Sequence, residues 1–178
     1  MSSHLPPNLP FSLPDFEANQ SEILLRMGDF FLNYLHRLRK AFDGDFMMAI
    51  VLGEIGHHNA SSFFSSGEGI RTGIDPDEFR ELMECCNAHS LSAATGIPRE
   101  TIRRKIDALL ERGWIEKVER KGLRITPACI DHFAHTFNLP VLAELLLVSR
   151  AITKVLPMAG GPSVPPQRTS ERRPASNG

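Results

Sequence analysis

The sequence contains few of the residues that carry redox or catalytic chemistry. It has only three cysteines among 178 residues, two of them adjacent at Cys85 and Cys86 and one distant at Cys129. This number and spacing exclude the disulfide framework of a small secreted domain, so we expect reduced thiols. A glycine-rich phosphate loop, a nucleophile elbow and paired zinc-ligand spacings are also absent. We therefore expect no enzyme, no cofactor and no metal site.

Long apolar runs are missing as well. No uninterrupted stretch approaches the ~18 residues that a membrane-spanning helix requires, and residues 1–14 lack the basic and apolar blocks of a secretory signal. Hydrophobic residues make up 42% of the chain and charged residues 23%, which is ordinary for a soluble globular protein. We expect a soluble, cytoplasmic protein without a membrane partner.

The chain is long enough for one hydrophobic core but not for two large domains. Four of its 13 prolines lie within residues 1–14 and five within residues 157–178, where Gly and Ser are also frequent. Such composition is typical of disordered segments. We therefore expect disordered tails at residues 1–20 and 157–178, on either side of one domain that spans residues 21–156.

Positive charge is scarce over most of the chain and concentrated in one segment. The formal net charge is −1, but residues 1–98 hold six basic and 13 acidic side chains, whereas residues 99–124 hold nine and five. The first part therefore carries −7 and the short segment +4. A local basic patch on an acidic body is typical of a small module that binds a polyanion. A solvated helix face of mixed charge has the same composition, so this alternative stays open.

The spacing of apolar residues predicts several helices. Residues 21–42 carry apolar side chains at intervals of three and four, which predicts a long amphipathic helix. Residues 46–55 are apolar nearly all round, as in a buried helix, and residues 59–74 are typical of an exposed loop. The other four prolines each precede helical apolar spacing and indicate helix starts. These starts are Pro76, Pro98, Pro127 and Pro140. The helix after the first of them would bury Phe79, Leu82, Met83 and Cys86.

The first and last of these helices expose more apolar surface than one small core needs. We therefore expect residues 21–42 and 128–156 to form the interface of a homodimer. The alternative is that these apolar faces pack only within one chain.

Two short helices and the turn between them form the most informative segment. Residues 87–95 predict a helix with Asn87 as its N-cap. The turn Gly96-Ile97-Pro98 follows, because glycine readily adopts the left-handed backbone that ends a helix. Residues 99–112 predict the second helix, and two helices joined in this way form a helix-turn-helix. The expected buried residues are Leu91 and Ala94 in the first helix and Ile102, Ile106, Leu109 and Leu110 in the second.

A β-hairpin is predicted directly after the second helix. Residues 114–118 and 123–126 can pair around the turn Arg120-Lys121-Gly122, and Trp114 would fill the core between the second helix and this hairpin. The segment LSAATGIPRETIRRKIDALLERGWIEKVERKGLRITPA resembles the core of the winged helix-turn-helix transcription regulators, with a likeness that covers about residues 87–128. The flanking helices are similar to those of MarR-type dimeric repressors, whose wing is typically longer.

The resemblance implies a mainly α fold, in which a winged helix-turn-helix carries a two-stranded β-wing and long dimerisation helices flank it. It also implies a homodimer that binds double-stranded DNA in a sequence-specific manner and regulates transcription. The major groove of B-DNA admits one helix, and arginine can bond guanine there. We expect base contacts from Arg99, Glu100, Arg103 and Arg104. We expect backbone contacts from Thr101, Lys105, Arg120, Lys121 and Arg124. This interpretation requires that carboxylates of the same chain do not sequester the arginines after Pro98.

Two other functions stay open on the sequence. A winged helix can serve protein interaction alone, with its arginines merely solvated. Alternatively, a thiol- or metal-responsive repressor could use Cys85, Cys86 and His89, and a small-molecule effector could bind near residues 46–55. The register argues against a metal site, because arsenic-type repressors place a Cys-x-Cys pair where this chain has Asn87 and His89. Burial is also the commoner fate of a free thiol.

Overall fold

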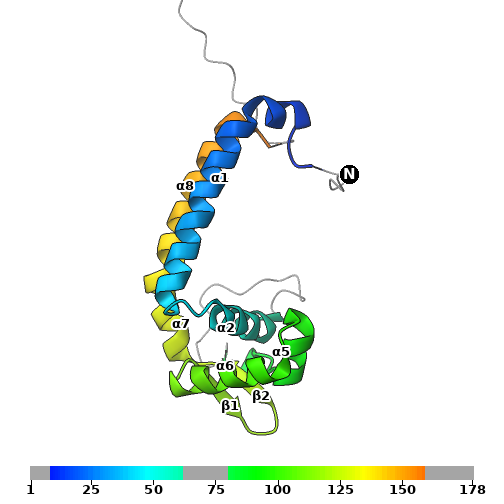
Figure 1. Cartoon of the computed structure of the whole chain (residues 1–178), viewed down its shortest axis with the longest axis vertical. Coiled ribbons are helices and arrows are strands. Elements are labelled where there is room, and N and C mark those ends of the chain that lie inside the picture. The colour runs from blue at the N-terminus through cyan, green and yellow to red at the C-terminus, as the bar shows by residue number, and fades with distance from the viewer. Residues whose placement is uncertain (1–8, 62–79, 159–178) are drawn as a thin grey trace, which may run out of the picture.

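The structure is a computed structural model that describes residues 9–61 and 80–158. It consists of a long two-helix arm and a head of shorter elements at one end of the arm (Figure 1). The described chain is mainly helical and contains a two-stranded antiparallel sheet. The expectation of a mainly α fold with a β-hairpin is therefore confirmed.

Helix α1 (Leu13–Ala41) forms one side of the arm. The Ser12 hydroxyl caps it by accepting a hydrogen bond from the Asp15 N–H at 3.5 Å, and Pro14 stands in the first turn, where its missing N–H costs nothing. The helix thus begins well before residue 21. The prediction of disorder over residues 1–20 is therefore wrong for residues 13–20, because this cap and this proline are helix-start signals.

The C-terminal helices form the other side of the arm. Helix α7 (Pro127–Phe133) continues through a π-helical turn, η1 (Ala134–Asn138), into α8 (Leu139–Val155), whose first turn contains Pro140 as predicted. Helix α8 runs antiparallel to α1 (Figure 1), and Glu144 accepts a hydrogen bond from Asn33 of α1 at 2.8 Å. The arm is thus an antiparallel pair of helices formed by the first and the last helix of the described chain.

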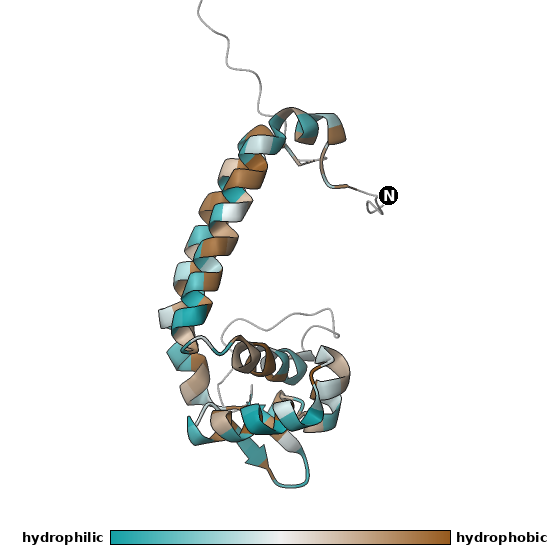
Figure 2. Ribbon diagram, in the orientation of Figure 1, coloured by the Kyte–Doolittle hydropathy of each residue, from teal (hydrophilic) through white to brown (hydrophobic). Residues whose placement is uncertain are grey.

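The arm exposes an apolar surface that one chain does not cover. By length and composition, Pro127–Val155 is one helix that is long and apolar enough to cross a membrane, and none of its most apolar window is buried. The sequence shows no uninterrupted run here because charged residues such as Glu144 and Arg150 break it. Figure 2 shows hydrophobic residues recurring along both helices of the arm, in contrast to the largely hydrophilic α6.

The head packs three helices and the hairpin around one core. Asp45 caps its first helix by accepting a hydrogen bond from the Met48 N–H at 3.0 Å. In the hairpin Ile115 lies opposite Ile125, and Cys86 forms an additional bridge to Leu123. The elements are α2 (Phe46–Asn59), α5 (Ala88–Thr95), α6 (Arg99–Glu111), β1 (Ile115–Val118) and β2 (Gly122–Ile125). The largest fully buried side chains are those of Val51, Ile55, Asn59, Cys86, Leu91, Ile102 and Leu109.

Helix α2 is less buried than its composition predicts. Its inner face is in the core, but Phe46, Met47 and Ile50 remain exposed. The expectation of burial all round is therefore wrong, because α5, α6 and the hairpin pack against one side of α2. Of the predicted loop at residues 59–74, Asn59 instead ends α2 as a fully buried side chain, and residues 62–74 lie outside the described residues.

The segment that precedes α5 also differs from the prediction. Phe79 lies outside the described residues, Arg80 to Leu82 are helical, and the Leu82 side chain is 50% exposed. Met83 and Cys86 are buried as expected, but Cys86 lies in an extended segment that pairs with β2 rather than in a helix. The helical spacing was misleading because a tertiary strand contact, which apolar periodicity does not reveal, determines this backbone.

Two predicted core positions have other environments. Ala94 is exposed on α5. Trp114 is half-buried against the core, and its ring packs edge-on against Phe42 and Phe133, with centroid distances of 5.6 and 5.0 Å. Trp114 therefore joins the head to the base of the arm.

Candidate nucleic-acid interface

Local sequence signals determine where α5 ends and where α6 begins. Asn87 forms a capping box with Ser90 at the start of α5, and Gly96 ends that helix with a φ of 71°, in the left-handed region. The Ser92 hydroxyl donates to the Ile97 carbonyl at 2.8 Å, and the Ile97 side chain is buried. The three-residue turn is thus held at both ends, and α6 begins directly after it at Arg99.

One face of α6 is buried and the opposite face is exposed. Ile102, Ile106 and Leu109 enter the core. The exposed face carries charged side chains, as the helical rotation of about 100° per residue predicts. At its N-terminal half these are Arg99, Glu100, Arg103 and Arg104.

Arg103 is bound by two carboxylates of its own helix. Its Nε and Nη2 donate to Glu100 Oε2 and Oε1 at 3.1 and 2.8 Å, and its Nη1 donates to Asp107 Oδ2 at 3.2 Å. The hydrogen bond from Arg103 holds the pKa of Glu100 below its ordinary value. The guanidinium side chain nevertheless remains 61% exposed. Arg103 is therefore paired but not sequestered from solvent.

The other α6 residues that we expect to contact DNA differ in whether side chains of the same protein bind them. Arg104 is exposed and forms no ion pair with any residue in the described ranges. Arg99 bonds to Nδ1 of His89 on α5, and Thr101 is half-buried. The Lys105 ammonium lies 2.6 Å from Asp45 Oδ2, which ties α6 to the N-cap of α2. Burial alone would raise the pKa of Asp45, but the hydrogen bonds from Lys105 and Met48 lower it overall.

The hairpin turn exposes two cations. Arg120 and Lys121 are exposed, and Arg120 has a φ of 57°. Gly122 has a φ of 128°, and a Cβ at this position would lie 2.3 Å from the Cys86 carbonyl oxygen. Only glycine fits this position, so the turn is fixed where the hairpin meets the segment before α5.

Arg124 occupies a different environment from the turn cations. It lies opposite Glu116 in the hairpin, bonds to its carboxylate at 2.9 Å, and donates to the Arg80 carbonyl at 2.8 Å. Its side chain is only 14% exposed. Hydrogen bonds from Arg80 and then from Arg124 hold the pKa of Glu116 below its ordinary value, although burial opposes this. Arg124 therefore braces the hairpin, and the requirement that arginines stay free of the chain's own carboxylates is not met at this residue.

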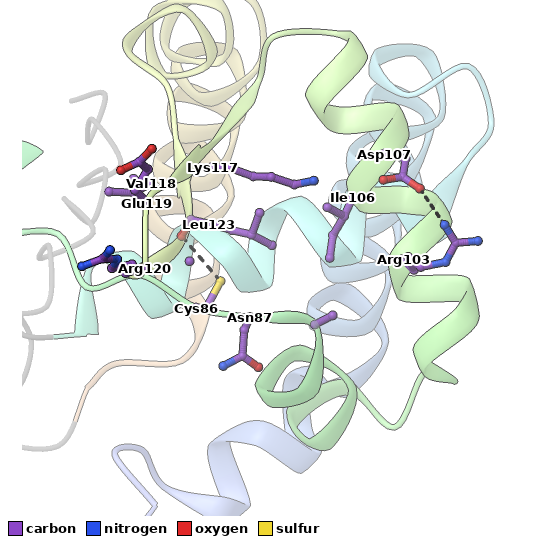
Figure 3. A pocket seen from close by; sticks show the side chains of 12 residues that line it. Cys86, Asn87, Arg103, Ile106, Asp107, Lys117, Val118, Glu119, Arg120 and Leu123 are labelled. Atoms are coloured by element: carbon purple, nitrogen blue, oxygen red, sulfur yellow. Dashed lines mark hydrogen bonds and ion pairs between the residues drawn. The ribbon is translucent and has the colours of Figure 1, made fainter.

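A groove of about 530 Å³ lies between α6 and the hairpin (Figure 3). Ile106 and Leu123 contribute apolar lining. The charged lining residues are the cations Arg103, Lys117 and Arg120 and the carboxylates Asp107 and Glu119. Figure 3 shows Lys117 extending from β1 toward α6. The sequence prediction omitted Lys117. Strand alternation was the available signal, because it places Lys117 on the same face as the buried Ile115.

Cys86 and Cys129 are buried, as structural thiols are, whereas Cys85 is half-buried. Burial raises the pKa of both Cys86 and Cys129 to about 11, which disfavours the reactive thiolate. Within residues 9–61 and 80–158, no three His, Cys, Asp or Glu side chains gather into a group that could hold a metal ion.

Comparison of the chain with protein-family models, with curated proteins and with solved structures gives no match.

Proposed function

We propose that the protein is a cytoplasmic, sequence-specific DNA-binding regulator of transcription that acts as a homodimer through a winged helix-turn-helix. The observation that carries this proposal is the pairing of two basic features on one side of the head. Arg103 of α6 and Arg120 of the hairpin turn both line the groove, and Arg104 and Lys121, which follow them in the sequence, are exposed. In the proposed function α6 is the recognition helix and the hairpin is the wing.

The chemistry of these residues suits a duplex. A recognition helix reads base edges with side chains from its N-terminal half, and arginine can donate to guanine O6 and N7 together. We assign base reading to Arg103 and Arg104. Lys117 and Arg120, which line the groove, and the exposed Lys121 on the hairpin turn would neutralise phosphates and fix the position of the helix.

The arm supports a homodimer. Along α1 the exposed residues Leu24, Met27, Phe31 and Leu35 recur at intervals of three and four, and their exposed fractions lie between 38 and 53%. Met27 and Phe31 line one apolar groove together with Leu145 of α8, so the stripes of both helices share one side of the arm. We assign this side to a second copy of the chain, which would complete a four-helix bundle.

The position of α6 favours one arrangement of the two copies. In Figure 1, α6 and the hairpin lie at the end of the molecule remote from the tip of the arm. Two arms that pair with both heads at the same end would present both recognition helices to one duplex. Half-sites one helical turn apart, about 34 Å, would then be expected.

Selection of duplexes from a random-sequence pool tests the proposal. The protein should enrich a palindromic sequence, and its affinity should fall steeply as salt concentration rises. Absent or salt-insensitive binding would instead favour a winged helix that serves protein interaction alone.

A further inference from the structure

Arg103 is paired with two carboxylates of its own helix, and the stability of the fold does not explain this pairing. Its partners Glu100 and Asp107 are well exposed, with side-chain exposures of 63 and 49%. Ion pairs in such positions contribute little to folding, because water and salt screen them. The three side chains together carry a net charge of −1, in the middle of the surface to which we assign DNA binding.

The two carboxylates leave one edge of the arginine available. A guanidinium has five N–H donors. Glu100 takes one from Nε and one from Nη2, and Asp107 takes one from Nη1. Each of Nη1 and Nη2 therefore keeps one N–H that neither carboxylate accepts, and these two N–H groups can donate to acceptors on a base edge.

The same carboxylates make contact with phosphate unfavourable. A phosphate that approached Arg103 would lie within a few ångströms of two negative charges, whereas guanine O6 and N7 carry no formal charge. Like-charge juxtaposition is a general means of suppressing unwanted partners.

We propose that Glu100 and Asp107 are specificity-determining residues that hold Arg103 for base reading and bar it from phosphate. This inference rests on the proposed function and changes the role of Glu100, which acts through Arg103 rather than by contacting a base itself. In this arrangement the hairpin cations Arg120 and Lys121 bind phosphate without such restriction.

The test compares the wild-type protein with a variant that carries Glu100→Gln and Asp107→Asn. The probes are a duplex enriched by the wild type from a random pool and a random-sequence duplex of equal length. Fluorescence anisotropy over a range of salt concentrations measures both affinities. Glu111→Gln is the control, because it removes one carboxylate charge, against two in the double variant, from the exposed far end of α6.

The double variant should bind the random duplex about tenfold more tightly, as expected when two nearby like charges are removed in water. Its preference for the selected duplex should fall correspondingly. Its salt dependence on the random duplex should steepen by about one unit, because Arg103 gains one phosphate contact. Adding Arg103→Ala should abolish this gain, and Glu111→Gln should show neither effect.

An unchanged preference in the double variant, or an equal gain in the Glu111→Gln control, would overturn the inference while leaving the proposed function intact. A wild-type protein that prefers no sequence would refute the proposed function and this inference with it. Matching circular dichroism spectra establish that the variants are folded.

Discussion

The cations of the head divide into those that brace the fold and those that face solvent. Lys105 and Arg124 are held by Asp45 and Glu116, and both side chains are largely withdrawn from water. Arg104 and Lys121 are exposed. Under the proposed function only the exposed cations contact DNA. Those on α6 contact bases, and those on the hairpin turn contact phosphates.

Arg104→Ala and Lys121→Ala should therefore have different effects. The first should cost about 1 to 3 kcal/mol of affinity for a selected duplex and relax selectivity at one base pair. The second should weaken binding to all sequences alike and reduce the salt slope by about one unit. Affinity measured against a panel of single-substitution duplexes separates the two. Equal losses on every duplex for both variants would contradict base reading by Arg104.

Glu116→Gln should destabilise the fold, because it leaves the largely buried Arg124 without its carboxylate. The expected loss at about pH 7 is roughly 1 to 3 kcal/mol. The pKa of Glu116 is lowered in the folded state, so its stabilisation is present above its ordinary pKa and is lost as pH falls through the folded pKa. Urea unfolding should show a smaller difference from the wild type at about pH 3 than at about pH 7. A difference that is independent of pH would contradict this pairing.

Among the elements, those with local signals could be predicted and those defined by tertiary contact could not. The cap at Asn87, the turn at Gly96 and the apolar face of α6 all occur where the sequence places them. Cys86 was misassigned to a helix because its backbone pairs with Leu123, which is distant in sequence. The ion pair of Arg124 likewise depends on the strand register and on Arg80, and no helical or strand period encodes it.

The candidate DNA-binding site could likewise be predicted only in part. The exposed positions of α6 followed from helical rotation, whereas the pairing of Arg103 with Glu100 and Asp107 depends on side-chain conformations that spacing permits but does not determine. Strand alternation indicates which face of β1 carries Lys117, but the position of this residue beside the groove depends on how the hairpin packs against α6.

Gly122→Ala tests the attachment of the hairpin to the head. The added Cβ would collide with the Cys86 carbonyl oxygen in a backbone conformation that favours glycine. We expect a loss of stability of at least about 1 kcal/mol, as for other strained backbone positions. Thermal unfolding should show a lowered Tm. Gly53→Ala is the matched control, because a Cβ there meets no atom within 4 Å, and a helical alanine should be neutral or stabilising. Similar losses in both variants would contradict the proposed packing of the turn.

At the scale of the whole molecule, one chain leaves the apolar side of the arm exposed. Leu145→Glu should produce monomers, because it places a charge on the side that we assign to the second copy. Leu147→Glu is the control, since Leu147 is exposed on the opposite side of α8 and should leave the dimer intact. Sedimentation velocity distinguishes these states. A wild-type monomer, or a Leu145→Glu variant that still dimerises, would count against this interface.

Selection of duplexes from a random pool by the wild-type protein, with the stoichiometry of the selected complex measured by sedimentation, tests the proposed regulator as a whole. We predict an enriched inverted repeat whose half-sites are separated by about one helical turn, bound by two chains per duplex. A pool without an enriched sequence, or one chain bound to a single half-site, would contradict the proposed dimeric DNA-binding function.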